Sequence, residues 1–73
     1  MRERLIEVFK KTLKLNEVTE HLSQKNCIKW DSLNHLNLII EIEEEFDLSF
    51  EPEEIAEMKS FEIIENLIMA KIQ

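Results

Sequence analysis

Two adjacent polar residues, Asp31 and Ser32, stand where a loop leads into a predicted helix, and they are the side chains best placed for chemistry. A serine in the first turn of a helix lies beside backbone amides that have no helical partner and beside the positive end of the helix dipole. These amides and this dipole stabilise an anionic group attached to the hydroxyl. Either residue can instead serve only as the helix N-cap, which is a common use of Asp and Ser. The pair therefore indicates either a modified serine or a simple cap.

His35 follows closely enough to suggest a serine hydrolase formed with Asp31 and Ser32. A hydrolase needs a histidine that contacts the serine through one ring nitrogen and an acid through the other. Ser32 and His35 can meet one helical turn apart, but Asp31 cannot also orient the far nitrogen. A chain this small offers no evident oxyanion pocket. We therefore expect no catalysis by these residues.

A metal site formed by His21, Cys27 and His35 has no recognised ligand spacing, and a calcium-binding EF-hand loop needs a glycine that the chain lacks. We expect no metal. Cys27 is predicted to be a small apolar loop residue rather than a reactive thiol. As the single cysteine it cannot form an internal disulfide, which is typical of a reducing compartment.

The composition excludes several classes of function. The chain has 73 residues, no glycine and one proline. Phosphate-binding loops and dinucleotide-binding turns need backbone without a Cβ beside the phosphate, so both are excluded. A chain of this length predicts one domain, residues 1–73, with a small core and no deep catalytic pocket. The composition therefore excludes nucleotide-binding enzymes of the usual kinds.

The charge is distributed unevenly along the chain. Residues 1–30 carry 7 basic and 4 acidic side chains, whereas residues 31–73 carry 2 basic and 12 acidic ones. An acidic surface repels nucleic acid and anionic lipid and attracts proteins that have basic surfaces. The chain has no apolar run long enough to span a membrane and no signal-peptide pattern after Met1. We therefore expect a cytoplasmic monomer with basic protein partners, without nucleic-acid binding or membrane insertion.

The helices that position Asp31 and Ser32 are predicted from apolar residues that recur with the helical period. Either of the two residues can cap the helix that follows. Strands are not expected, because the chain lacks glycine and the two-residue turn signals of hairpins. Three longer helices are predicted, over residues 2–14, residues 32–46 and residues 61 to about 71.

Two connecting segments complete the predicted fold. Polar residues interrupt any period over residues 15–30, which predicts a long, partly ordered loop. A short helix is predicted from Pro52 through Met58, because proline suits the first helical position, and Ser60 can cap the last helix. The predicted fold class is all-α, a small four-helix bundle of three longer helices and one short helix. Its core is predicted to be lined by Leu5, Phe9, Leu38, Ile39, Ile42, Phe46, Ile64, Leu67 and Ile68.

The predicted helix over residues 32–46 has a second face that packing into the core does not explain. Away from the core stripe, helical spacing brings together Leu33, Asn37, Ile40 and Glu44. This face mixes aliphatic and acidic side chains. It is therefore either a docking surface for a partner or an ordinary surface on which a small protein leaves aliphatic residues exposed.

The chain resembles the acyl carrier protein family in two motifs, the tripeptide D-S-L at residues 31–33 and the E-E-E-F run at residues 43–46. The resemblance covers essentially the whole chain, because the length, the acidity and the order of predicted helices also agree. It implies the family's fold, a single acyl-carrier domain. It also implies that Ser32 carries a covalent 4′-phosphopantetheine, whose thiol holds an acyl group as a thioester. Asp31 and Leu33 complete the attachment motif.

Three positions depart from the family pattern. Trp30 stands where the family usually has a small residue, and Asn34 and Asn37 stand where it often has acids. Trp30 either packs on the core or lies along the prosthetic arm, and the core is favoured because burying tryptophan is strongly stabilising. Partners that use Arg or Lys at the asparagine positions would meet neutral amides there. Glu43 and Glu44 remain available to them.

The resemblance therefore implies a discrete acyl carrier protein that is not itself an enzyme and serves a dedicated pathway for fatty acids, polyketides or other products. Its expected partners are a phosphopantetheinyl transferase and acyl-loading and acyl-transferring enzymes with basic docking surfaces. The predicted docking residues are Leu33, Ile40, Glu43 and Glu44. Two alternatives stay open: an aminoacyl or peptidyl carrier, and an acidic helical adaptor that binds a basic partner without being modified.

Overall fold

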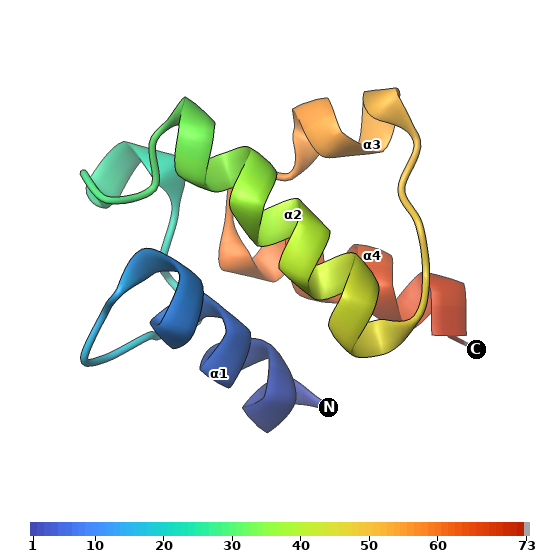
Figure 1. Cartoon of the computed structure of the whole chain (residues 1–73), viewed down its shortest axis with the longest axis horizontal. Coiled ribbons are helices and arrows are strands. Elements are labelled where there is room, and N and C mark those ends of the chain that lie inside the picture. Colours follow the sequence, from blue (N-terminus) through green and yellow to red (C-terminus); the bar gives the residue numbers. More distant parts are fainter. Residues whose placement is uncertain (73) are drawn as a thin grey trace.

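The computed structural model describes residues 1–72 and contains four α-helices in the predicted order (Figure 1). The predicted all-α, four-helix class is confirmed. In Figure 1 α2 runs diagonally across the front of the molecule, α1 and α3 lie on either side of it, and both termini lie at the same end. Over the described residues, no helix has the length and apolar character needed to cross a bilayer. The elements are α1 (Arg2–Leu13), the 3-10 turn η1 (Gln24–Asn26), α2 (Ser32–Phe46), α3 (Pro52–Glu57) and α4 (Phe61–Ile72).

The helices begin where the sequence offers caps. The carboxylate of Asp31 accepts a hydrogen bond from the backbone amide of Asn34 at 2.8 Å, and this bond starts α2. The hydroxyl of Ser60 accepts from the amide of Ile63 at 3.2 Å and caps α4 as predicted. At α3, Pro52 occupies the first helical turn. Local capping chemistry therefore sets three of the helix starts.

Two helices end on residues with left-handed backbone. Lys14 follows α1 with φ 55°, and Asp47 follows α2 with φ 54°. The backbone N–H of each cap residue donates to a carbonyl of the last turn. This position usually takes glycine, which the chain lacks. The ends of α1 and α3 lie within one residue of their predicted positions.

The long connection between α1 and α2 is more ordered than its irregular sequence suggests. It contains η1, and a short antiparallel bridge ties Ser23 to Ser60 at the start of α4. The bridge consists of the hydrogen bonds from the Gln24 amide to the Lys59 carbonyl at 3.0 Å and from the Phe61 amide to the Leu22 carbonyl at 2.9 Å. Because Val18 and Trp30 of this connection are also buried, the segment is attached to the core near both of its ends.

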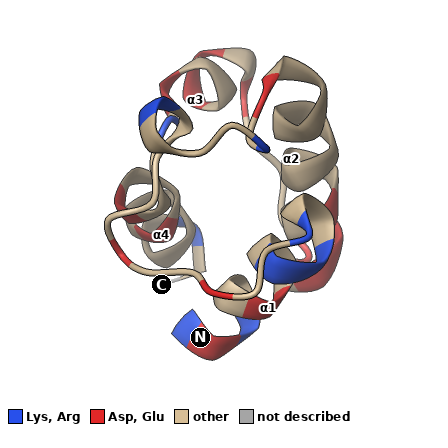
Figure 2. Cartoon of the chain, turned by 90° about the vertical axis from the view of Figure 1, so that its left-hand side faces the viewer, with Lys and Arg blue, Asp and Glu red and all other residues tan. Residues whose placement is uncertain are grey.

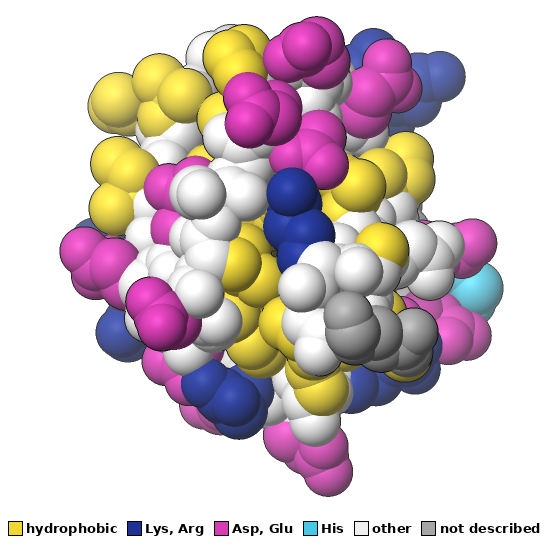
Figure 3. Space-filling view, turned by 90° about the vertical axis from the view of Figure 1, so that its right-hand side faces the viewer, with side chains coloured by type: hydrophobic (Ala, Val, Ile, Leu, Met, Phe, Trp, Pro, Cys, Tyr) yellow, Lys and Arg dark blue, Asp and Glu magenta, His cyan; other side chains and the backbone are white. Residues whose placement is uncertain are grey.

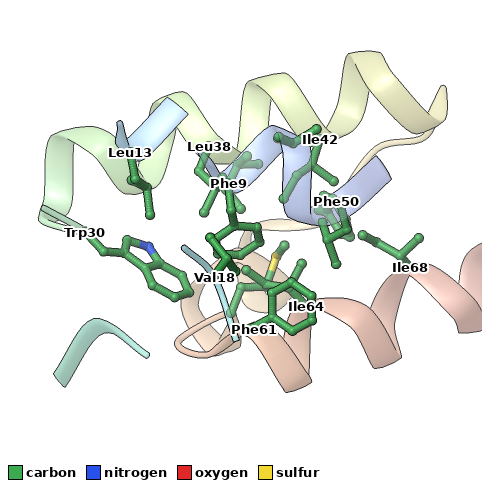
Figure 4. Packing of buried hydrophobic residues seen from close by; sticks show 14 residues of the cluster. Phe9, Leu13, Val18, Trp30, Leu38, Ile42, Phe50, Phe61, Ile64 and Ile68 are labelled. Carbon is green, nitrogen blue, oxygen red and sulfur yellow. The ribbon is translucent and has the colours of Figure 1, made fainter. Parts of the chain in front are cut away.

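The core lies between the four helices, and Figure 4 shows its side chains beneath α2. Seven of the nine predicted core residues are buried, but Phe46 and Leu67 are only partly buried, so the prediction that they line the interior is wrong. Phe46 is the last residue of α2, and its ring is covered from outside by the guanidinium of Arg4 at 4.7 Å from the ring centroid. Leu67 lies on the flank of α4 beside the buried stripe of Ile64 and Ile68. The other buried residues, which the predicted core lining did not include, are Val8, Leu13, Val18, Trp30, Phe50, Met58 and Phe61.

Ion pairs connect α1 to its neighbours. Two guanidinium nitrogens of Arg2 donate to the two carboxylate oxygens of Glu65, both at 2.7 Å. The Glu65 side chain is largely buried, and the hydrogen bond from Arg2 holds the pKa of its carboxyl below the usual range against the opposing effect of burial. Arg4 donates to a carboxylate oxygen of Glu45 at 2.9 Å. The basic first part of the chain is thus used to pair with acids of α2 and α4.

Candidate functional site

Ser32 is the first residue of α2 and is exposed to solvent. Asp31 before it is the N-cap, and the Asp31 carbonyl accepts the His35 amide at 2.8 Å. The Asp31 carboxylate already takes the amide of Asn34. Within residues 1–72, the amides of Ser32 and Leu33 have no hydrogen-bond partner. An open hydroxyl therefore lies beside two free backbone donors at the positive end of a helix that has fifteen residues.

Trp30 fixes the position of this serine, two residues along the chain. Its side chain is 2% exposed, and its ring meets Phe9 edge-on with the centroids 5.3 Å apart. Phe9 in turn contacts Phe61 of α4 at 5.1 Å. The prediction that Trp30 packs on the core is confirmed. Because the ring is buried, the start of α2 is anchored to the interior rather than to a mobile loop.

His35 connects three elements through both ring nitrogens. The indole Nε1 of Trp30 donates to Nδ1 of His35 at 3.0 Å, and Nε2 of His35 lies 3.1 Å from the carbonyl oxygen of Ile55 in α3. A neutral imidazole with its proton on Nε2 satisfies both contacts, because Nδ1 then accepts and Nε2 donates. Neither nitrogen is directed at Ser32, and the carboxylate of Asp31 caps the helix. These three residues therefore do not assemble the hydrolase arrangement.

The two asparagines of α2 have structural partners. The side-chain amide of Asn34 donates to the Lys29 carbonyl at 2.8 Å, and the Lys29 ammonium donates to the Lys14 carbonyl at 2.9 Å. A chain of hydrogen bonds thus links α2, the preceding loop and the end of α1. The amide of Asn37 makes only a long contact, 3.4 Å, with the Asn34 side chain. An aspartate at position 34 could not donate to Lys29, whereas Asn37 is free of this requirement.

The structure places the four predicted docking residues in different surroundings. Leu33 and Ile40 are 70% and 51% exposed, and Glu44 is exposed as well. Glu43 is half-buried, and its carboxylate accepts the Phe50 amide at 3.0 Å, so it holds the segment before α3. Leu36, which is not among the predicted docking residues, is 56% exposed. Its spacing of one turn from both Leu33 and Ile40 is the signal that could have placed it on the same face.

Unpaired acidic charge concentrates along α2 and α3. Residues 31–58 contain ten acids and no Lys or Arg. Three of these acids pair with bases of α1 or α4: Glu41 with Lys11, Glu45 with Arg4 and Glu54 with Lys71. Figure 2 shows Asp and Glu along α2 and α3, and Lys and Arg together with some acids on α1 and the loop after it. In Figure 3 several acidic side chains lie together at the top of the molecule, and others are spread over the rest of that face. The face of α2 and α3 that points away from α1 is therefore acidic.

Glu54, one of the three paired acids, accepts from two donors. The Glu51 backbone amide donates to the Glu54 carboxylate at 2.8 Å, and the Lys71 ammonium lies 3.0 Å from the same oxygen. The hydrogen bond from Glu51, and after it that from Lys71, lowers the pKa of the Glu54 carboxyl. Glu54 therefore stays ionised further into acid than an isolated glutamate.

His21, Cys27 and His35, for which the sequence predicted no metal site, lie in separate surroundings. His21 is exposed and lies beside Glu20, Cys27 is half-buried against the core, and His35 has the partners described above. In the part of the chain that the structure describes, no group of three or more His, Cys, Asp or Glu side chains could hold a metal ion.

No protein-family model matches the chain, and no curated protein matches it either.

Proposed function

We propose that this protein is an acyl carrier that holds acyl groups as thioesters on a 4′-phosphopantetheine attached to Ser32. The observation that carries this proposal is the exposed hydroxyl at the first position of α2, beside the free amides of Ser32 and Leu33. The arm is attached through a phosphodiester, and these donors, with the helix dipole, stabilise its negative charge. The residues present thus fit the group, since nothing has to move to expose the hydroxyl.

In the attachment reaction the chain supplies the nucleophile. The Oγ atom of Ser32 forms a bond to the phosphorus next to the pantetheine of coenzyme A, and the bond from that phosphorus to the adenosine bisphosphate breaks. The serine proton passes to a base of the phosphopantetheinyl transferase, which also supplies Mg²⁺ for the phosphate charge. The attached thiol then provides the thioester chemistry. The carrier itself positions the serine through Asp31 and Trp30.

We further propose that partner enzymes dock on the exposed face of α2. Leu33, Leu36 and Ile40 offer apolar contact, and Glu44 lies on the same helix. The acidic charge of α2 and α3 attracts enzymes whose entrances carry Lys or Arg. In this proposal the partners are the transferase and the enzymes that load and transfer acyl groups, and the carrier works with them in the cytoplasm.

The test is the intact mass of the protein after incubation with coenzyme A, Mg²⁺ and a transferase of broad specificity. We expect the wild type to gain one phosphopantetheine and Ser32→Ala to gain none. Ser49→Ala is the matched control, because Ser49 is also exposed but precedes α3 rather than α2, and it should gain the same adduct as the wild type. A wild type without an adduct, or a Ser32→Ala variant with one, contradicts the proposal.

The apolar and acidic face of α2 also favours a second candidate, an acidic adaptor that binds a basic partner without modification. Leu33, Leu36 and Ile40 would serve such a partner equally well. The two functions differ at Ser32, because an adaptor tolerates alanine there and a carrier does not. An aminoacyl carrier would pass the mass test as an acyl carrier does, and the group found on the arm after loading in cells separates those two.

A further inference from the structure

We propose that the group carried on Ser32 stays outside the helical core, which suits this protein to short or polar acyl groups. The inference rests on the proposed function and concerns the fate of the carried chain. An alkyl chain in water gains free energy by entering an apolar interior. The bundle must admit the chain between its helices for this to happen, and the side chains around the start of α2 oppose it.

The part of the core beneath the first turn of α2 is filled by Trp30. Its ring, 2% exposed, lies against Phe9, and Phe9 lies against Phe61, so three aromatic rings follow one another into the interior (Figure 4). A chain that entered beside Ser32 would have to displace the indole. Protein interiors are close-packed, so the displaced ring has no vacant site to occupy.

The gap between α2 and α3 at this level is closed by His35. Its imidazole lies nearly parallel to the Trp30 ring, with the centroids 6.1 Å apart and 27° between the planes, and bonds to the indole N–H and the Ile55 carbonyl. Moving the imidazole aside would leave a donor of Trp30 and an acceptor of Ile55 without partners. Half-buried polar groups that lose their partners oppose such an opening.

A surface hollow next to α2 lies on its other flank and does not replace the closed route. It is a hollow of about 300 Å³ between α1 and α2. Its lining includes Lys11, Thr12 and Glu41, and the ammonium of Lys11 lies 3.5 Å from the Glu41 carboxylate. An alkyl chain gains little from surroundings that carry paired charges and remain open to water. The carried group therefore stays in solvent near the exposed side chains of α2. Remaining in water costs the least free energy for a group that is short or polar.

The experiment compares two loaded forms of the wild-type protein. A transferase and the corresponding coenzyme A thioesters attach acetyl-phosphopantetheine or octanoyl-phosphopantetheine to Ser32. The intact mass is read first, and a chain that gains no adduct contradicts the proposed function and not this inference. The forms that load are then compared by thermal unfolding and by the fluorescence of Trp30, which is the single tryptophan in a chain without tyrosine.

We expect the acetyl and octanoyl forms to share one Tm and one emission maximum. An octanoyl chain inside the core would stabilise the folded state, raise the Tm by several degrees and shift the emission of the displaced indole. That result would overturn the proposal. Hydroxylamine cleavage of the two thioesters, each relative to its free coenzyme A thioester, gives a second measurement. Equal relative rates support an exposed group, and slower cleavage of the octanoyl form contradicts it.

Trp30→Leu tests the assigned cause, because it opens space where the indole was. The octanoyl form of this variant should unfold at a higher temperature than its acetyl form. A folded variant without this difference would show that Trp30 is not what excludes the chain, and the assignment would fail. The wild-type comparison decides where the carried group lies even if the variant does not fold.

Discussion

The two helices on either side of α2 are held in different ways. α1 buries Leu5, Val8, Phe9 and Leu13, and its Arg and Lys side chains pair with acids of α2 and α4. α3 has six residues and buries none of them. Apart from the half-buried Ile55, which packs against the core, its attachments are polar. The Ile55 carbonyl contacts His35, the amide of Phe50 just before α3 donates to Glu43, and Glu54 pairs with Lys71.

The two sides of α2 therefore differ in role: one side contributes most to the stability of the fold, and the other side is the one left exposed to partners. The side of α2 next to α1 carries most of the packing and uses the basic charges of the chain. The side next to α3 keeps unpaired acids, and α3 itself, Pro52–Glu57, has no fully buried side chain. Segments with few buried apolar contacts open at the lowest free energy. We therefore expect the surface that meets partners to coincide with the most easily opened part of the fold.

The largest expected effect is the loss of stability caused by a substitution in the packed side of α1. Phe9→Ala removes a fully buried ring that contacts Trp30 and Phe61, and should lower the free energy of unfolding by about 3 to 5 kcal/mol. This is a large share of the stability of so small a domain. Phe46→Ala, which removes a partly buried ring, should cost clearly less. Urea unfolding of both variants checks the order, and equal losses would contradict the burial difference.

Next in size is the apolar part of docking on α2. Burying Leu33, which is 70% exposed in the free protein, in a partner is worth about 1.5 to 3 kcal/mol. Leu33→Ala should therefore lower kcat/KM of phosphopantetheinyl transfer by about tenfold or more. The matched control is Ile63→Ala, because Ile63 is also exposed but lies on α4. Equal effects of the two variants on kcat/KM would contradict the proposal that partners dock on α2.

The difference in local opening between α1 and α3 can be measured by amide hydrogen exchange. The amides of α3 should exchange through local opening well before those of α1, because α3 has no buried side chain to lose. Ile55→Ala, which truncates a half-buried side chain of α3, should cost only about 1 kcal/mol of stability. Exchange of α1 and α3 at the same rate would show that they open as one unit.

A smaller effect is expected from acid on the pair of Arg2 and Glu65. The folded-state pKa of Glu65 lies below its unfolded value because Arg2 donates to the carboxylate. The pair therefore contributes its full stability above the unfolded pKa of about 4.3 and loses it as the pH falls through the folded pKa. Glu65→Gln should lower the Tm by a few degrees at pH 7 and make the Tm less sensitive to pH below about 4. The control Glu62→Gln, at an exposed position of α4, should retain the wild-type pH profile.

The smallest expected effect concerns charge on the docking face. Asn37→Asp adds an acid without removing a strong hydrogen bond, since its amide contact is 3.4 Å long. Each exposed charge pair is worth about 0.2 to 1 kcal/mol, so modification should be slightly faster at low salt and unchanged at high salt. Glu44→Lys should slow it under the same conditions. Modification rates that change neither with the substitutions nor with the salt concentration would exclude electrostatic attraction of the partner. Asn34→Asp is a poorer test, because Asn34 holds the Lys29 carbonyl.

The features predicted from the sequence are those with a local cause. The spacing of apolar residues and the caps Asp31 and Ser60 were enough to place the four helices to within about one residue. Ser32 could be placed at a helix start for the same reason. Trp30 and His35 could be singled out, but their hydrogen bond to each other and the link to Ile55 depend on how α3 folds back, which no local pattern encodes.

Core membership was predicted less well for residues outside the periodic stripes. Val18, Phe50 and Met58 are buried from connecting segments, where there is no helical period to indicate the inner side. Phe46 was predicted to be buried but is only partly buried. A residue at the end of a helix keeps its angular position but lacks the next turn of side chains that would cover it. The exposed Leu36 lies in the row of α2 next to that of Leu33 and Ile40, so the spacing that predicted the docking face did not include it.

The left-handed ends of α1 and α2 bear on how this sequence can change over evolution. Lys14 and Asp47 hold a backbone conformation that disfavours residues with a Cβ by roughly 1 to 2 kcal/mol each. Both side chains are exposed, so a glycine at either position would release much of that strain without disturbing the interior. The fold thus holds an unused reserve of stability at two surface positions. A lineage could draw on this reserve to tolerate otherwise damaging changes elsewhere, including new side chains on the face of α2 that meets partners.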